Sequence, residues 1–224
     1  MDSVLRVQAR FGQRTLLLTT AALPLTGWAV HARALHRRLD DAGKDPLTGL
    51  LRRDVYTVRA RRILARHGND TCVVMVDLDR FKQINDTLGH AVGDSVLAAT
   101  AARLTAWAGP RAAVGRLGGD EFTILLRLPG PRREARLATL MQMLHAPVVV
   151  GGQDVPVAAS VGAASPDILN TRELAQLQRA ADSALYDGKH TGQACLAEPR
   201  HTHVPSVNGR RAGRPGTSAL GVAA

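Results

Sequence analysis

The chain has 224 residues, a formal net charge of +10 and only 3% aromatic residues, a length that suits one ordinary domain with short appendages. Residues 1–44 and 199–224 together carry +8 of that charge, whereas 45–198 is nearly balanced. A nucleic-acid groove is therefore not expected, because the basic excess lies outside the predicted core and aromatic residues for base stacking are scarce.

The first predicted element is an uncharged helix in the segment 1–44. Residues 16–30 (LLLTTAALPLTGWAV) carry no charge and are followed by Arg33, Arg37 and Arg38. The segment is shorter than the roughly 20 residues that span a bilayer, although snorkelling of Arg33 lengthens it. We expect residues 15–35 to attach the chain to an anionic membrane, as a spanning or a surface helix. A cleaved signal peptide and a helix packed on soluble protein are the alternatives.

The rest of the chain alternates between helical and strand patterns. Apolar residues recur at helical spacing in four segments, 52–67, 90–107, 132–144 and 171–187. The run TCVVMV at 71–76 predicts a buried strand. Two hairpins are predicted, one pairing 113–116 with 122–128 and one pairing 148–150 with 155–161.

These elements predict an α+β domain over residues 45–198. Interleaved helices and strands with two tight hairpins favour a largely antiparallel sheet with helices packed on it. A short linker helix is expected just before the domain, where 35–44 reads LHRRLDDAGK. After Glu198 the chain is rich in Pro, Gly and Arg, so 199–224 is expected to be a disordered basic tail.

Two acidic segments point to metal chemistry. Asp77 comes directly after the predicted strand, and Asp120 and Glu121 follow a pair of glycines in the first hairpin. A carboxylate at the end of a buried strand needs a charged partner, solvent or a metal, and hard oxygen ligands suit Mg²⁺ or Mn²⁺. Either segment alone is also typical of an ordinary turn.

Five segments together resemble one family. In order and spacing, DPLTGLLRR, VDLDRFKQINDTLGHAVGD, RLGGDEF, SVGAA and ADSALYDGKHTG are similar to the marker segments of GGDEF-domain diguanylate cyclases. The likeness covers about 150 residues. It implies a five-stranded, mostly antiparallel sheet flanked by helices, similar to the palm of nucleotidyl cyclases. It also implies that the protein joins two GTP molecules into cyclic di-GMP.

The resemblance assigns the catalytic and metal positions. It implies two Mg²⁺ or Mn²⁺ ions per active site, held by Asp77, Asp120 and the main-chain carbonyl of Leu78. Glu121 matches an acid near the attacking 3′-hydroxyl, so it is expected to accept its proton or orient it. The remaining catalytic positions are the turn glycines, which let the backbone approach the α-phosphate: Gly118 and Gly119.

The same resemblance assigns the substrate contacts. Asn85 and Asp94 match the positions that read the edge of guanine, and an amide with a carboxylate supplies the necessary donors and acceptors. Lys82 and Lys189 match the triphosphate contacts, assisted by the main-chain amides from Leu78 to Lys82, including that of Phe81.

The chain departs from the family pattern at three places. Gln193 replaces a basic residue that grips the triphosphate, so a lower GTP affinity is expected. The inhibitory product site, an Arg-x-x-Asp, is replaced by residues 109–112 (GPRA), which predicts little product inhibition there. Arg52 replaces a common Asn, and nothing in the sequence explains this change.

The sequence therefore predicts a cytoplasmic diguanylate cyclase that acts as a homodimer, binds GTP and binds no nucleic acid. The alternative is an inactive domain of the same family that binds GTP or cyclic di-GMP as a sensor or scaffold. A cyclase or polymerase-like enzyme of the same palm fold is a third possibility.

Overall fold

The computed structural model of the chain describes residues 28, 31, 33, 42–189 and 191–203, and the chain divides into two units, 1–43 and 44–224. In the first unit Trp28, His31 and Arg33 are helical and exposed. None of the helices within the described ranges is long and apolar enough to cross a membrane. Most of the predicted membrane segment 15–35, the linker 35–41 and the tail beyond 203 lie outside the described residues, so those predictions stay predictions.

The second unit is built on a five-stranded sheet with the order β2-β3-β1-β6-β7. β1 (Thr71–Leu78) occupies the centre and pairs antiparallel with both β3 (Glu121–Arg127) and β6 (Ala159–Ala164). β2 (Ala113–Gly118) extends the sheet beside β3 in the predicted hairpin. β7 (Cys195–Leu196), which the sequence did not predict, is short and runs parallel to β6. The expected fold class, a mostly antiparallel five-stranded sheet with flanking helices, is confirmed.

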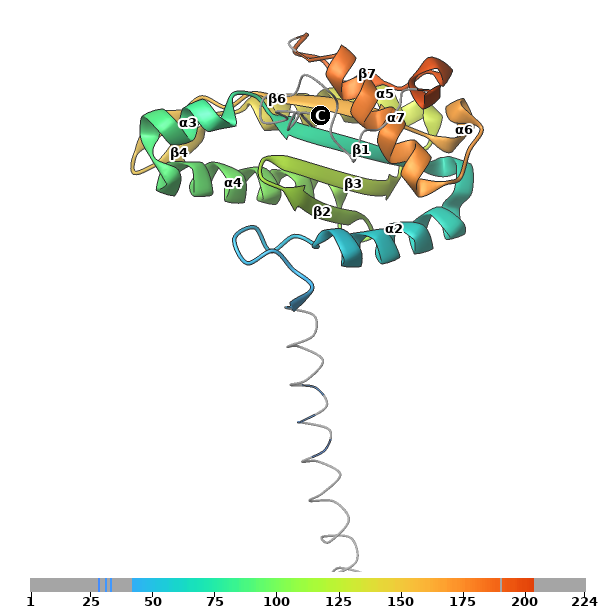
Figure 1. Ribbon diagram of the computed structural model, residues 1–224, viewed down its shortest axis with the longest axis horizontal. Helices are drawn as coiled ribbons and strands as arrows, with labels where there is room; N and C mark the ends of the chain where they lie inside the picture. Colours follow the sequence, from blue (N-terminus) through green and yellow to red (C-terminus); the bar gives the residue numbers. More distant parts are fainter. Residues whose placement is uncertain (1–27, 29–30, 32, 34–41, 190, 204–224) are drawn as a thin grey trace, which may run out of the picture. The chain divides into compact units, whose positions relative to one another are not determined.

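The two faces of the sheet are covered by different helices (Figure 1). Every residue of β1 is buried, and successive side chains alternate between the faces. Val74 and Leu78 join a cluster with α4 (His90–Ala108) and α5 (Gly130–His145). Val73 and Met75 join a second cluster with α2 (Arg53–His67) and α7 (Leu174–Asp187). A continuous apolar run, rather than an alternating one, is what a strand buried on both faces requires.

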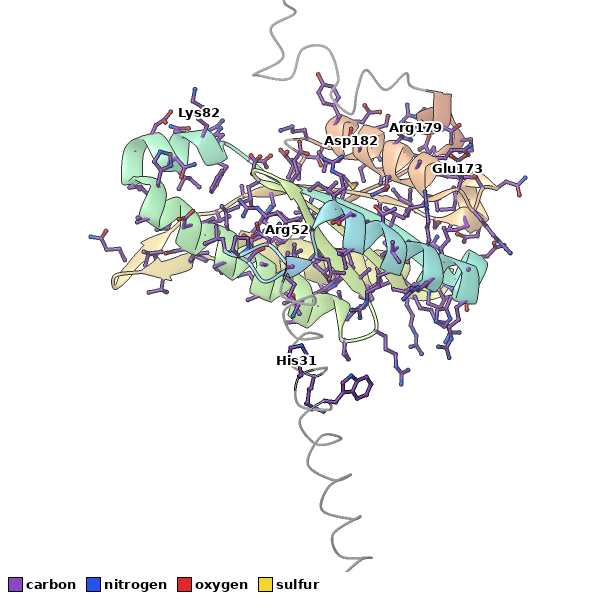
Figure 2. All side chains as sticks on the ribbon, turned by 60° about the horizontal axis from the view of Figure 1, so that its bottom comes forward. His31, Arg52, Lys82, Glu173, Arg179 and Asp182 are labelled. Atoms are coloured by element: carbon purple, nitrogen blue, oxygen red, sulfur yellow. The ribbon has the colours of Figure 1, made fainter. Side chains whose placement is uncertain are left out.

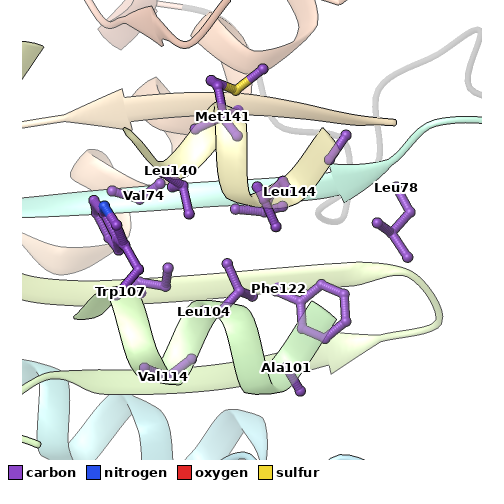
Figure 3. Packing of buried hydrophobic residues seen from close by; sticks show 14 of the residues in the cluster. Val74, Leu78, Ala101, Leu104, Trp107, Val114, Phe122, Leu140, Met141 and Leu144 are labelled. Carbon is purple, nitrogen blue, oxygen red and sulfur yellow. The ribbon is translucent and has the colours of Figure 1, made fainter. Parts of the chain in front are cut away.

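Large apolar side chains fill the cluster under α4 and α5 (Figure 3). Phe122 from β3 and Leu104 from α4 are fully buried, and each contributes about 1.5–3 kcal/mol by leaving water. Trp107 is 3% exposed, and its indole Nε1–H donates to the carbonyl of Arg136 on α5 at 2.8 Å. This packing holds the centre of β1 and the start of β3 in a rigid frame.

The second predicted hairpin is wrong in extent. β4 (Val148–Val150) pairs with β5 (Gln153–Val155) in a separate two-stranded sheet, and β6 belongs to the main sheet instead. Gly151 and Gly152 both have positive φ, which allows a two-residue turn between β4 and β5. Pro156 then follows β5 and has no N–H to continue the ladder, so residues 155–161 do not form one strand.

The prediction of a disordered tail is wrong for its first five residues. Residues Pro199–His203 form a 3-10 helix, η2, which contacts α7 and α6 (Pro166–Leu169). His201 in this helix is only 2% exposed. Composition suggested a tail here because the chain after Glu198 is rich in Pro, Gly and Arg, but one buried histidine anchors the segment. The remaining short elements are η1 (Gly68–Asp70) and α3 (Phe81–Leu88).

Candidate active site

The two acidic segments meet at the end of β1. Asp77 lies directly opposite Glu121 on β3, so the two side chains leave the sheet on the same face. The N–H of Leu78 donates to the carbonyl of Asp120 at 3.3 Å, which brings the turn acid alongside the strand end. The β2–β3 turn and α3 lie at this same end of the sheet (Figure 1). Segments more than forty residues apart in sequence thus form one acidic strand end.

Asp77 is a buried carboxylate with a cationic neighbour. Its side chain is 8% exposed, and one of its oxygens, Oδ1, lies 2.9 Å from Nζ of Lys189. Lys189 follows the C-terminus of α7, which packs against the same face of the sheet. A buried carboxylate without an opposite charge is strongly unfavourable, so the ammonium group compensates Asp77 electrostatically. The fold therefore brings a predicted metal ligand and a predicted triphosphate contact together.

Asp79, the second acid after β1, belongs to a different environment. Its N–H donates to the carbonyl of Ala158 at 2.9 Å, and its Oδ1 accepts from the hydroxyl of Ser160 at 2.8 Å. These bonds tie Asp79 to the start of β6, on the far side of β1 from β3. Asp77 rather than Asp79 faces the turn acids.

The glycine turn between β2 and β3 has free space where side chains would project, and Arg116 supports its main chain. A Cβ added at Gly118 or Gly119 would meet no atom within 4 Å, and both residues have positive φ. Arg116 donates from Nε and Nη2 to the carbonyl of Gly119, at 2.9 and 2.7 Å, and its Nη1 lies 3.0 Å from Oδ1 of Asp45. Through these contacts Arg116 supports the hairpin.

Asp45 anchors that brace to the start of the domain. Burial raises the pKa of Asp45, but hydrogen bonds from Thr48 and from the Arg116 guanidinium outweigh it, so the pKa lies below its ordinary value. The charged form of Asp45 is thus stabilised in the fold. The position of the turn depends on this ionised contact.

Asn85, one of the two predicted guanine-reading residues, packs against a glycine that the sequence reasoning did not single out. A Cβ on Gly93, in the first turns of α4, would lie 1.9 Å from Oδ1 of Asn85 and 3.3 Å from the ring of Phe81. The carboxamide of Asn85 therefore rests on the α4 backbone beside Gly93, whose neighbour in the chain is the exposed Asp94. A glycine inside a helical pattern was the available signal, because such a residue usually has a packing reason.

Lys82 lies on α3 with an exposed side chain (Figure 2). Within the described part of the chain it makes no ion pair. Its predicted contact with the triphosphate stays a prediction. Arg80, just before α3, has a φ of 54°, so the backbone bends sharply between β1 and α3.

The donor set at the strand end fits a divalent cation. In the ranges that the structure describes, no group of three or more His, Cys, Asp and Glu side chains is close enough to hold a metal alone. Mg²⁺, however, usually takes one or two protein carboxylates and completes its octahedron with phosphate oxygens and water. Asp77 and an acid of the turn, together with the carbonyl of Leu78, supply oxygen ligands of that kind.

A cavity of about 730 Å³ adjoins the acidic strand end. Its walls include Asp79 and Arg80 from the β1–α3 bend, and Gly188 and Gln193 from the segment after α7. Asp77 and Asn85 do not line it. The cavity is therefore next to the acidic cluster rather than around it.

Comparison with known proteins agrees with this architecture. The family model for the diguanylate cyclase GGDEF domain matches residues 42–195. An uncharacterized 19.3 kDa protein of Streptomyces ambofaciens is 46% identical over 167 residues, which cover 75% of this chain and 89% of that protein. The diguanylate cyclase TpbB of Pseudomonas aeruginosa is 37% identical over 166 residues, covering 70% of this chain but only 38% of TpbB.

Solved structures share the fold as well. The diguanylate cyclase SiaD of Pseudomonas aeruginosa, crystallised with its activator SiaC, matches with a TM-score of 0.65 and 31% identity, over 88% of this chain and 78% of that one. The GGDEF domain of TpbB matches with a TM-score of 0.63 and 35% identity, over 70% and 96%. The sheet order, the glycine turn and the acidic strand end define a GGDEF domain. The chain belongs to the diguanylate cyclase GGDEF family, as the resemblance in its sequence predicted.

Proposed function

We propose that the protein is a diguanylate cyclase, which condenses two GTP molecules into cyclic di-GMP with release of two pyrophosphates, and that residues 45–198 form its catalytic domain. The observation that carries the proposal is the meeting of Asp77 with Glu121 and Asp120 at the end of the central strand. Lys189 lies at the same point and supplies a positive charge for a phosphate. Family membership supports the choice of reaction, because TpbB and SiaD are named as diguanylate cyclases.

Asp77, Asp120 and the carbonyl of Leu78 would hold the two Mg²⁺ or Mn²⁺ ions. When bound, such ions neutralise phosphate charge and steady the attacking and leaving oxygens of an in-line displacement. The position of Asp77 is consistent with this role, since the sheet fixes the carboxylate at the strand end and a buried carboxylate is stable beside positive charge, as its contact with Lys189 illustrates.

The chain's own side chains would bind and orient the nucleotide. Asn85 would accept from and donate to the guanine edge, and the Asp94 carboxylate would accept from it. Asn85 packs against α4 where Gly93 has no side chain. Lys189 would bind the triphosphate, and the glycine turn, which has no Cβ atoms and open space beside it, would let the α-phosphate approach the backbone closely. Glu121, on the same face as Asp77, would accept the proton of the attacking 3′-hydroxyl.

Two protomers would complete the reaction. Each domain holds one GTP, so both bonds of cyclic di-GMP form only when two half-sites face each other. The attacking oxygen of each nucleotide then displaces pyrophosphate from the α-phosphate of the other. Attachment of residues 15–35 to an anionic membrane would raise the local concentration and favour this pairing.

A second candidate is an inactive GGDEF domain that binds GTP or cyclic di-GMP as a sensor. It is favoured by Gln193, which replaces a basic group and lies on the wall of the cavity beside the acidic strand end. One fewer positive charge weakens the grip on a triphosphate.

The full chain incubated with GTP and Mg²⁺ separates these candidates. An enzyme releases pyrophosphate and forms cyclic di-GMP, measured by chromatography, whereas a sensor shows only a thermal shift with nucleotide. Asp120→Ala should lower product formation by about a hundredfold or more, because it removes a proposed metal ligand and no core packing. Asp154→Ala, which removes an exposed acid from β5, is the matched control and should leave the rate unchanged. Equal rates for the wild type and Asp120→Ala would contradict the proposal.

A further inference from the structure

We infer that His201 is a positioning residue for the nucleotide site, and that η2 is part of the scaffold that holds Lys189 beside Asp77. This inference rests on the proposed function, since it concerns the proposed triphosphate contact. Residues beyond Glu198 lie outside the five marker segments and outside the region that the family model matches. Their role follows from contacts in the structure.

The imidazole of His201 is buried and bonded on both sides. Nδ1 lies 2.8 Å from the main-chain nitrogen of Glu198 and 3.2 Å from the carbonyl oxygen of the same residue, and it accepts from the Glu198 N–H in the tautomer that carries the ring proton on Nε2. Nε2 lies 3.1 Å from Oδ2 of Asp187 and donates to it. The His201 side chain is 2% exposed, while that of Asp187 is 46% exposed. Both ring nitrogens are thus satisfied, and the ring forms a fixed link from η2 to α7.

Asp187 is the last residue of α7, where a carboxylate is electrostatically unfavourable. The C-terminal end of a helix carries a partial negative charge from its free carbonyls. An N–H donor from His201 offsets this repulsion and holds the Asp187 side chain in one orientation. The hydrogen bond from His201 therefore stabilises the C-terminal residue of α7.

Lys189 comes two residues after Asp187. The helix end is closed by hydrogen bonds from the N–H of Gly188 to the carbonyl of Ala184, at 2.9 Å, and from the N–H of Lys189 to the carbonyl of Tyr186, at 3.2 Å. Nζ of Lys189 then reaches Asp77 across 2.9 Å. A long side chain such as that of Lys189 occupies a defined position only when its main chain is fixed. Fixing the turn at 187–189 therefore keeps the ammonium group close to Asp77.

The test measures affinity for a non-hydrolysable GTP analogue with Mg²⁺, by calorimetry on the full chain. Asp187→Ala removes the acceptor from an exposed side chain, so the fold is kept and the dissociation constant should rise about tenfold, the size of one lost hydrogen bond. His201→Asn keeps an acceptor for the Glu198 N–H but cannot reach Asp187, and it should have the same effect. His201→Gln restores a donor at the position of Nε2 and should bind nearly as well as the wild type.

If the inference is correct, the loss of affinity for the GTP analogue depends on the presence of Lys189. In a Lys189→Met background, Asp187→Ala should cause no further loss of affinity, because the group that it positions is already absent. A merely structural role would lower the melting temperature and the affinity equally in both backgrounds. Unchanged affinity in Asp187→Ala and His201→Asn, or equal losses in both backgrounds, would overturn the inference while leaving the proposed function intact. A wild-type chain that does not bind the analogue would contradict the proposed function, and with it the premise of this inference.

Discussion

Replacing Gly93 with alanine should separate nucleotide binding from stability. A Cβ at this position of α4 would lie 1.9 Å from Oδ1 of Asn85, far inside van der Waals contact. The atom that it meets is the end of a side chain rather than backbone, so Asn85 can rotate away. The helix is expected to stay intact, while the carboxamide leaves its position beside residue 93.

The expected magnitudes differ for the two properties. Alanine is favoured over glycine inside a helix by about 0.8–1 kcal/mol, and a displaced rotamer of Asn85 costs about 0.5–1.5 kcal/mol. The free energy of unfolding should therefore change by less than about 1 kcal/mol. If Asn85 makes two hydrogen bonds to guanine, their loss costs about 2–3 kcal/mol, which weakens GTP binding roughly 30- to 150-fold.

The assay is calorimetric binding of a non-hydrolysable GTP analogue, with urea unfolding of the same samples. Gly130→Ala is the matched control, because Gly130 is also helical and its added Cβ would meet only Oδ2 of Asp167, at 3.8 Å. This control should bind as the wild type does. Wild-type affinity in Gly93→Ala, with an unchanged unfolding curve, would refute the argument that Asn85 reads the base from this position.

Three further predictions concern the scaffold. Gly162→Ala places a Cβ 2.0 Å from a main-chain carbonyl oxygen of α7, which cannot rotate away. The free energy of unfolding, measured with urea, should therefore fall by about 3 kcal/mol, and a fall of less than about 1 kcal/mol would contradict this. The pKa of Asp45 is lowered in the fold, so the ionised carboxylate adds to the free energy of unfolding. This stabilisation is fully present above the unfolded-state pKa of about 3.9 and is lost as the pH falls through the pKa of the folded state. Asp45→Asn should therefore destabilise by about 1 kcal/mol at pH 7, through the weakened contact with Arg116, and the difference should shrink as the pH falls below about 3.9; a pH-independent difference would refute it. Burial raises the pKa of the Cys72 thiol to about 12, so mass spectrometry at pH 8 should find Cys195 alkylated and Cys72 unmodified until the protein unfolds; early modification of Cys72 would show the opposite.

Local patterns were sufficient for the main elements of the fold. The central strand was predictable because a short β-branched run buried on both faces has no other stable place, and it extends two residues beyond its prediction to include Asp77 and Leu78. The first hairpin was predictable from its glycine pair. The second was predicted too long, because the break at Pro156 depends on which strand joins the main sheet.

The candidate site was named from the sequence, but its arrangement was not. The marker segments identified Asp77, Asp120 and Asn85 by resemblance. The antiparallel register of β1 with β3 then set Asp77 opposite Glu121, and this register depends on pairing between strands far apart in the chain. The contact of Lys189 with Asp77 arises in the same way, from the packing of α7 on the sheet.

The amino-acid sequence by itself determined most of the helices and strands and identified the candidate site residues. Periodicity and turn residues depend on only a few neighbouring positions, so they can be recognised without the tertiary structure. Only the tertiary structure decided that Gly93 makes room for Asn85 and that His201 is anchored to Asp187 rather than lying in a tail. Those contacts join segments whose spacing in the chain carries no local pattern, and burial in a shared core, rather than propensity, selects them.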